Sequence, residues 1–151
     1  MDGLKRILLA EDCANDVELA LTALSEHRLA NKVVVVSDGV EAVDYLERRG
    51  QFAGRPGGNP AVVLLDIKMP KLDGLEVLRH MKSNDNLRTV PVVMLTSSRE
   101  EQDLIESYRL GVNAYVVKPV GFREFIDAVK NLGLFWAVLN EPPPGSIRKA
   151  A

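Results

Sequence analysis

Short runs of apolar residues recur along this chain, and longer stretches of mixed polarity separate them. The runs are rich in Val, Leu and Ile, and polar residues do not alternate with apolar ones inside them. This pattern is typical of strands that are buried on both faces, as in parallel sheets. The predicted strands cover residues 6–10, 33–36, 61–65, 90–95 and 114–117.

The stretches between these runs carry apolar residues at the spacing of one helical face. Asp38-Gly39 is a turn signal that opens the second predicted helix, and Gly111 is the expected C-terminal cap of the fourth. Strand–helix units repeated in this way predict an α/β fold, (βα)5, with a doubly wound, five-stranded parallel sheet and helices on both faces. The predicted apolar faces comprise Val17, Leu21, Leu24 and Leu29; Val40, Val43, Tyr45 and Leu46; Leu75, Leu78 and Met81; Leu104, Ile105 and Tyr108; and Phe122, Phe125, Ile126, Val129 and Leu132.

We expect one domain over residues 1–151, with a core over about 4–139. Residues 50–60 are rich in Gly and Pro and are predicted to form a long surface loop. The Pro-rich tail 140–151 is expected to be partly disordered.

Composition narrows the functional classes. The formal net charge is −2 and there is no basic stripe, so a nucleic-acid partner is not expected. No apolar stretch approaches the roughly 18 residues of a membrane span, and the N-terminus lacks a signal-peptide pattern. Cys13 is the single cysteine, which favours a reducing compartment. We therefore expect a cytoplasmic protein with no membrane association.

Polar side chains follow the carboxyl ends of four predicted strands, where open parallel sheets bind ligands. If the first and third strands are neighbours, their three carboxylates crowd one place, and a cation is needed to hold them. Carboxylates, a backbone carbonyl and waters suit Mg²⁺, whereas a lysine and a hydroxyl suit a phosphate. The strand-end residues are Glu11 and Asp12, Asp66, Thr96 and Ser97, and Lys118 and Pro119.

Each strand-end residue also has a simpler explanation when it is taken alone. Asp12 is a reasonable N-cap for the first helix, and Thr96 and Ser97 are reasonable cap residues for the fourth. Lys118 alone would be a solvated lysine. These explanations weaken because all the residues fall at the same end of successive strands, which favours one shared site.

The residues at these positions closely resemble the receiver domain of bacterial two-component response regulators. The resemblance covers about residues 4–139 and implies a flavodoxin-like sheet with strand order 2-1-3-4-5. The spacing, the 50–60 loop and the ending LGLFWAVLN are most similar to stand-alone receivers that serve phytochrome kinases. The motifs that carry the resemblance are ILLAEDCANDVEL (7–19), LLDIKMPKLDGLEVL (64–78), PVVMLTSS (91–98) and GVNAYVVKPV (111–120).

The resemblance implies that Asp66 accepts a phosphoryl group from a phosphohistidine on a partner sensor histidine kinase, and the likeness to phytochrome-type receivers makes a bacteriophytochrome the candidate kinase. Asp12, Asp66 and the backbone carbonyl of Lys68 would coordinate Mg²⁺, with Glu11 acting directly or through water. Asp73 and Gly74 would form the turn that opens the third helix. Such a protein is a switch that assists its own phosphorylation and dephosphorylation, rather than a turnover enzyme.

The resemblance also assigns roles at the ends of the fourth and fifth strands. Lys118 would pair with the phosphoryl oxygens and Thr96 would hydrogen-bond to the phosphoryl group. Thr96 and Tyr115 would form the conformational switch. Pro119 would follow a cis peptide bond with Lys118. The output would be protein–protein contact or onward phosphotransfer.

Three positions depart from the usual family residues. Cys13 stands where Asn is common, and we expect a small buried thiol there. Ser97 replaces a smaller residue and adds a hydroxyl near the phosphoryl position. Lys68 is expected to overhang the site, where its side chain would alter the lifetime of the phosphoryl group.

Residues 132–139 are apolar on every side, which implies a second buried face. Exposure of Phe135 or Trp136 would create an apolar patch of the kind that marks interfaces. We expect a homodimer through the side formed by the fourth strand and the fifth helix. The alternative is that the Pro-rich tail folds back over this segment.

Three other functions fit these residues less well. A degenerate receiver that only binds partners conflicts with the full set of acids, Thr96 and Lys118. A phosphatase with an aspartyl nucleophile would need a second Asp at the position of Lys68. A flavodoxin-like cofactor binder would need a phosphate-binding loop after the first strand, where Glu11 and Asp12 would repel a phosphate.

Overall fold

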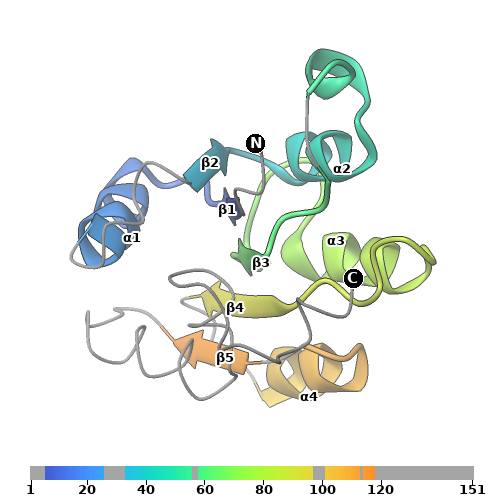
Figure 1. Cartoon of the computed structure of the whole chain (residues 1–151). Helices are drawn as coiled ribbons and strands as arrows, with labels where there is room; N and C mark the ends of the chain where they lie inside the picture. Colours follow the sequence, from blue (N-terminus) through green and yellow to red (C-terminus); the bar gives the residue numbers. More distant parts are fainter. Residues whose placement is uncertain (1–5, 26–32, 56–57, 97–100, 113, 118–151) are drawn as a thin grey trace, which may run out of the picture.

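The protein is an α/β sandwich with a five-stranded parallel sheet in the order β2-β1-β3-β4-β5, seen here in a computed structural model (Figure 1). The structure describes residues 6–25, 33–55, 58–96, 101–112 and 114–117. The predicted strand order and the parallel sheet are confirmed. The strands are β1 (Ile7–Ala10), β2 (Val33–Val36), β3 (Val62–Leu65), β4 (Val92–Thr96) and β5 (Ala114–Val117).

Helices cover both faces of the sheet. In Figure 1, α1 lies on one side, whereas α2 and α3 lie side by side on the other, with α4 next to α3 and β5. This is the doubly wound arrangement that the strand–helix repeat predicted. The helices are α1 (Ala14–Ser25), α2 (Gly39–Glu47), α3 (Gly74–Lys82) and α4 (Glu101–Arg109), and the predicted fifth helix lies outside the described residues.

The three central strands are buried on both faces, as their continuous apolar runs predicted. Side chains alternate between the two faces of a strand, so Leu8 and Leu9 point to opposite sides of the sheet. Both are 2% exposed or less, and the same holds for Leu64 and Leu65 in β3. The core on the α2–α3 side is built around Leu8, Ala10, Val63, Leu65, Val92 and Met94 from the sheet and Val43, Leu46, Val77, Leu78 and Met81 from the helices.

The segment at 50–60 has more structure than the predicted loop. It contains a short 3-10 helix, η2 (Gly50–Phe52), and Arg55 ties the segment back to α2. The Arg55 Nε donates to the Tyr45 carbonyl at 2.7 Å, and its guanidinium lies 4.1 Å from the centre of the Tyr45 ring. The Gly and Pro content therefore predicted an irregular connection, but it did not predict the contacts of Arg55 with Tyr45.

Helix α4 differs from its prediction in orientation. The residues expected to face the core, Leu104, Ile105 and Tyr108, are 38%, 50% and 52% exposed, whereas Ser107 is fully buried. Gly111 does end the helix as predicted, with a left-handed φ of 94°. Among the described residues, no helix has the length and apolar character needed to span a membrane.

Candidate functional site

The backbone carries the sheet hydrogen bonds one residue beyond β1 and β3. The Glu11 N–H donates to the Val36 carbonyl at 3.0 Å, and the Asp66 N–H donates to the Ala10 carbonyl at 3.1 Å. The residues that follow both strands therefore start from fixed positions at the carboxyl edge of the sheet. This confirms the premise that β1 and β3 are neighbours.

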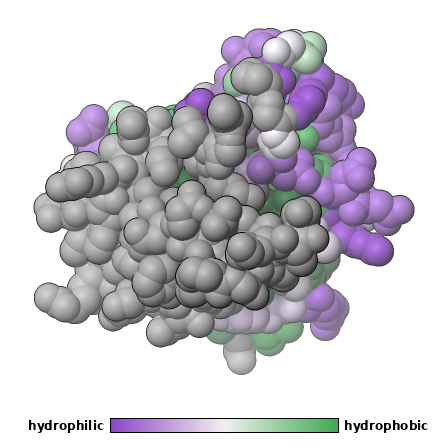
Figure 2. Space-filling view, in the orientation of Figure 1, coloured by the Kyte–Doolittle hydropathy of each residue, from purple (hydrophilic) through white to green (hydrophobic). Residues whose placement is uncertain are grey.

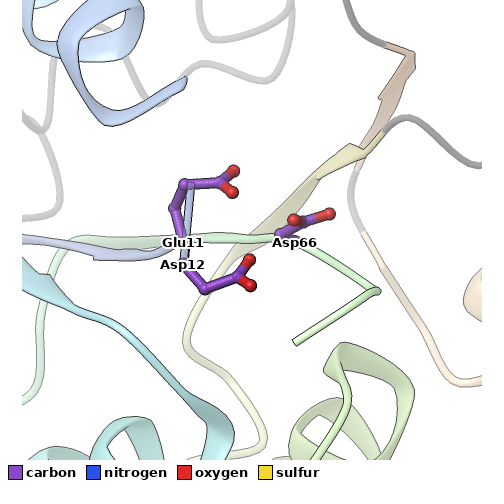
Figure 3. Close-up of side chains that lie close together, drawn as sticks. All are labelled: Glu11, Asp12 and Asp66. Carbon is purple, nitrogen blue, oxygen red and sulfur yellow. The ribbon is translucent and has the colours of Figure 1, made fainter. Parts of the chain in front are cut away.

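Three carboxylates meet at this edge, as Figure 3 shows. Glu11, Asp12 and Asp66 each place one carboxylate oxygen within 4.8 Å of the others. Glu11 and Asp66 are only 4% and 5% exposed, whereas Asp12 is exposed. The sequence thus predicted which acids would gather, and the structure brings all three together.

The donor set fits a small divalent cation. Negative charges this close repel one another, and burial of two of the three carboxylates adds a desolvation cost. A hard cation removes both penalties, and carboxylate oxygens are the ligands that such cations prefer. The geometry therefore favours a metal site over three independent helix caps.

Cys13 follows the acidic pair and is exposed, so the prediction of a buried thiol is wrong. The main-chain hydrogen bonds of Cys13 explain why its side chain is exposed. The Cys13 N–H donates to Glu11 Oε2 at 3.2 Å, and its carbonyl accepts from the Val17 N–H at 3.0 Å. The residue therefore starts α1 and orients Glu11 through its main chain, while its side chain faces outward.

The loop from Asp66 to Asp73 is tightly folded. The Gly74 N–H donates to the Ile67 carbonyl at 2.8 Å, which folds the loop back on its own start. A Cβ on Gly74 would lie 2.3 Å from the Asp66 carbonyl oxygen, so the position has no room for a side chain. Asp73 caps α3 and forms a capping box with Glu76. The predicted turn at Asp73-Gly74 is confirmed.

Lys68 extends toward α4. Its Nζ lies 3.9 Å from Asp103 Oδ2, and its side chain is 60% exposed. The sequence placed this side chain over the carboxylates, and the structure instead gives it an acidic partner on the neighbouring helix. The contact joins the loop after Asp66 to α4.

The remaining predicted site residues are described only in part. Thr96 is the last residue of β4, at the same edge of the sheet as Asp66. Tyr115 pairs with Met94 in the register of β4 and β5 and packs against the core. The predicted roles of Ser97, Lys118, Pro119, Phe135 and Trp136 fall outside the described residues.

A further acid, which the strand-end pattern did not predict as part of the site, lies at this edge. Asp38 lies just beyond β2, is 7% exposed, and pairs through Oδ2 with Lys71 Nζ at 3.3 Å. The strand-end rule that identified Asp66 applies equally to β2. The Asp38-Gly39 turn signal predicts the start of α2 but does not indicate the ion pair with Lys71.

Comparison with known proteins agrees with this geometry. The family described as "Response regulator receiver domain" matches residues 7–130. The response regulator Rcp1 of Synechocystis sp. is 36% identical over 132 residues, covering 87% of this chain and 88% of Rcp1.

Solved structures with the same fold include two bacteriophytochrome response regulators. RtBRR is 61% identical with a TM-score of 0.82, covering 96% of this chain and 87% of that one. AtBRR is 64% identical with a TM-score of 0.79, covering 91% and 99%.

Two more distant neighbours were solved in states that bear on the chemistry. One is the phosphorylated cyanobacterial phytochrome response regulator RcpA, 38% identical with a TM-score of 0.76, covering 93% of this chain and 99% of that one. The other is the Mn²⁺-bound form of Rcp1, 34% identical with a TM-score of 0.74, covering 94% and 99%. This chain belongs to the response regulator receiver domain family, whose members are phosphoacceptor switches of two-component systems and partners of histidine kinases.

Proposed function

We propose that Asp66 is the phosphoacceptor of a stand-alone receiver. One observation carries the proposal: Asp66 is a buried carboxylate at the end of the central strand β3, with oxygens of Glu11 and Asp12 within 4.8 Å. A carboxylate fixed at a sheet edge is a suitable nucleophile when cations neutralise the charge of the incoming phosphoryl group.

Glu11, Asp12 and Asp66, with the backbone carbonyl of Lys68, are the residues that would hold Mg²⁺. The Mn²⁺-bound form of Rcp1 supports a divalent ion at such a site. When bound, the ion supplies positive charge that lowers repulsion between the phosphoryl oxygens and the carboxylates. The buried walls at Glu11 and Asp66 strengthen that attraction by excluding water.

The chemistry of Asp66 is a substitution at phosphorus. A carboxylate oxygen of Asp66 forms a bond to the phosphorus of a phosphohistidine as the P–N bond breaks, and the electron pair leaves with the imidazole. The product is an acyl phosphate, which water can hydrolyse to restore the carboxylate. The protein would therefore act as a switch rather than as a turnover enzyme.

The family resemblance supports the remaining roles. Lys118 would pair with the phosphoryl oxygens, and the Lys118–Pro119 bond would be cis. Thr96 would hydrogen-bond to the phosphoryl group, and Tyr115 would change rotamer with it. The position of Thr96 at the end of β4 and the packing of Tyr115 on the core support a link between them, because β4 and β5 are paired.

The partner we propose is a bacteriophytochrome histidine kinase in the cytoplasm, because two bacteriophytochrome response regulators share 61% and 64% of their residues with this chain. The output would be protein contact or phosphorelay without nucleic-acid binding. A homodimer through β4 and the fifth helix, with Phe135 and Trp136 at the interface, would provide one such contact. Sedimentation of the wild type against Trp136→Glu tests it, since a monomer in both cases would reject the dimer.

The decisive experiment is phosphorylation with a small phosphodonor and Mg²⁺, read by intact mass. The wild type should gain one phosphoryl group, and Asp66→Asn should gain none. Asp85→Asn is the matched control, because Asp85 lies away from the site with its side chain 91% exposed, and this variant should behave as the wild type. Equal phosphorylation of Asp66→Asn and wild type would refute the assignment.

A further inference from the structure

The loop that follows Asp66 is held against the start of α2 at three points. Lys71 Nζ lies 3.3 Å from Asp38 Oδ2, and the Gly39 N–H donates to the Pro70 carbonyl at 3.4 Å. Gly39 also lies directly against Leu72. We call this set, Asp38, Gly39, Pro70, Lys71 and Leu72, the clasp.

The clasp leaves no space between the two loops. A Cβ on Gly39 would lie 2.1 Å from the Leu72 carbonyl oxygen and 2.4 Å from the Leu72 Cβ. Neither distance is compatible with a side chain, so even alanine at position 39 must push the loop away from α2. The contact fixes the distance between two segments that lie more than thirty positions apart in the sequence.

Asp38 serves both sides of the clasp. Its Oδ1 accepts the Glu41 N–H at 2.8 Å and so caps α2, while its Oδ2 faces Lys71. The side chain is 9% exposed, so its charge is largely desolvated and depends on these partners. The carboxylate therefore does more than start a helix.

Lys71 adopts a left-handed backbone conformation with φ of 72°. This region is uncommon for residues other than glycine and persists where surrounding contacts over-determine it. The ion pair to Asp38 and the Leu72 N–H bond to the Pro70 carbonyl, 2.8 Å, supply those contacts. The clasp thus holds the outer turn of the loop in a strained form.

We propose that the clasp positions the Lys68 carbonyl for the cation, with Asp38, Gly39 and Lys71 as positioning residues that touch neither metal nor phosphoryl group. The inference rests on the proposed function. Asp66 and the Asp73 cap fix the two ends of the loop, and the clasp fixes its middle, three residues after Lys68. Loss of an outer-shell partner that bonds a metal ligand directly changes metal affinity by about 10–100-fold, and we expect the clasp, which acts through the loop backbone, to lie at the lower end of that range.

The test uses substitutions that remove the ion pair and keep the local backbone. Asp38→Asn retains an N-cap side chain, because Asn caps helices as well as Asp does. Lys71→Asn retains tolerance of the left-handed conformation. Each should weaken Mg²⁺ binding in titration calorimetry by about tenfold, and the double variant should be no worse than either alone.

Amide hydrogen exchange in the metal-free protein provides a second measurement. The Met69 and Leu72 amides should exchange faster in Asp38→Asn and Lys71→Asn than in the wild type. The melting temperature of each variant should stay within about 4 °C of that of the wild type. Gly39→Ala should show the same changes more strongly. Gly54→Ala is the matched control, because a Cβ there meets nothing within 4 Å, and it should match the wild type.

The outcomes separate the clasp from the site itself. Asn variants that lose stability but bind Mg²⁺ within about twofold of the wild type would overturn the clasp's role. Wild-type protein that binds no Mg²⁺ and takes up no phosphoryl group would overturn the proposed function and this inference with it. If Gly39→Ala does not fold, the two Asn variants still decide the question.

Discussion

Helices α3 and α4 are neighbours that are held in different ways. Helix α3 buries Val77, Leu78 and Met81 completely and begins with a capping box at Asp73. Helix α4 buries the polar Ser107 and exposes its large apolar side chains. Figure 2 shows the consequence at the surface: hydrophobic colour lies over α4 at the lower edge, whereas the surface near α2 and α3 is mostly hydrophilic.

The ion pairs that join α3 and its preceding loop to α4 are partly solvated. Arg79 Nη2 lies 3.3 Å from Glu106 Oε2, and Lys68 reaches Asp103 at 3.9 Å. Exposed ion pairs of this kind contribute only about 0.2–1 kcal/mol. Helix α3 is therefore held mainly by its buried side chains and its cap, whereas these ion pairs add little to what holds α4.

Truncation of an apolar side chain on α3 and of one on α4 should give the largest difference in the free energy of unfolding. Met81→Ala should lower the free energy of unfolding by about 2–5 kcal/mol, because it leaves a cavity in a fully packed core. Ile105→Ala should change it by about 0.5 kcal/mol or less, because Ile105 is half exposed. Urea denaturation measures both, and equal losses would contradict the proposed difference between the helices.

Removal of the N-cap of α3 should have a smaller effect on the free energy of unfolding. Asp73→Ala should lower the free energy of unfolding by about 1 kcal/mol, because it leaves the Glu76 N–H at 2.8 Å without its acceptor and breaks the capping box. Asp73→Asn should lose much less, since Asn is a good N-cap. Both variants can be compared by thermal unfolding, and a neutral Asp73→Ala would show that packing alone fixes the start of α3.

Substitution of two serines by alanine should change the free energy of unfolding in opposite directions. Ser107 Oγ is buried and has no hydrogen-bond partner among the described residues, so Ser107→Ala should raise the free energy of unfolding by up to about 1 kcal/mol. Ser83 Oγ donates to the His80 carbonyl at 2.9 Å, so Ser83→Ala should lower it by about 0.5 kcal/mol. Destabilisation by Ser107→Ala would indicate a partner for that hydroxyl.

Acidification should weaken the contact that Glu47 of α2 makes with His80 of α3. Burial opposes ionisation of Glu47, but its hydrogen bond to His80 and the charges of His80 and Arg49 outweigh this and lower the Glu47 pKa below 4.5. A lowered pKa gives stability that is present above about pH 4.5 and is lost as the pH falls through the folded-state value.

The corresponding measurement is the free energy of unfolding between pH 6 and pH 3 for wild type and Glu47→Gln. The substitution should cost under about 1 kcal/mol near pH 6 and should reduce the acid-dependent loss. Gln102→Ala is the control on α4, because it replaces an exposed side chain that does not titrate, and it should leave the acid-dependent loss as in the wild type. A steeper loss in Glu47→Gln would contradict the sign of the effect.

The sequence predicted the parts of the fold that local chemistry controls. Continuous Val, Leu and Ile runs identified the strands within about two residues, and the Asp38-Gly39 pair located the start of α2, whereas the start of α3 at Asp73-Gly74 came from the family resemblance. Strand ends identified Glu11, Asp12 and Asp66 as one site, because parallel strands bring their carboxyl ends to one edge.

Other features depended on contacts between distant segments. An apolar pattern cannot say which face of α4 meets the sheet, and Leu104, Ile105 and Tyr108 turned outward. Cys13 reads as a small apolar residue in sequence, but the start of α1 places it at the surface. The Lys68–Asp103 and Lys71–Asp38 pairs join residues that are more than thirty positions apart.

The sequence by itself therefore determined the α/β class, the strand order through its family resemblance, and the acids that gather after β1 and β3. Only the tertiary structure showed how α3, α4 and the loop after Asp66 are held beside the site. The physical reason is that apolar runs and helix caps are patterns of neighbouring residues, which can be read along the sequence. A contact between distant segments, such as Gly39 against Leu72, exists only after those segments have packed together.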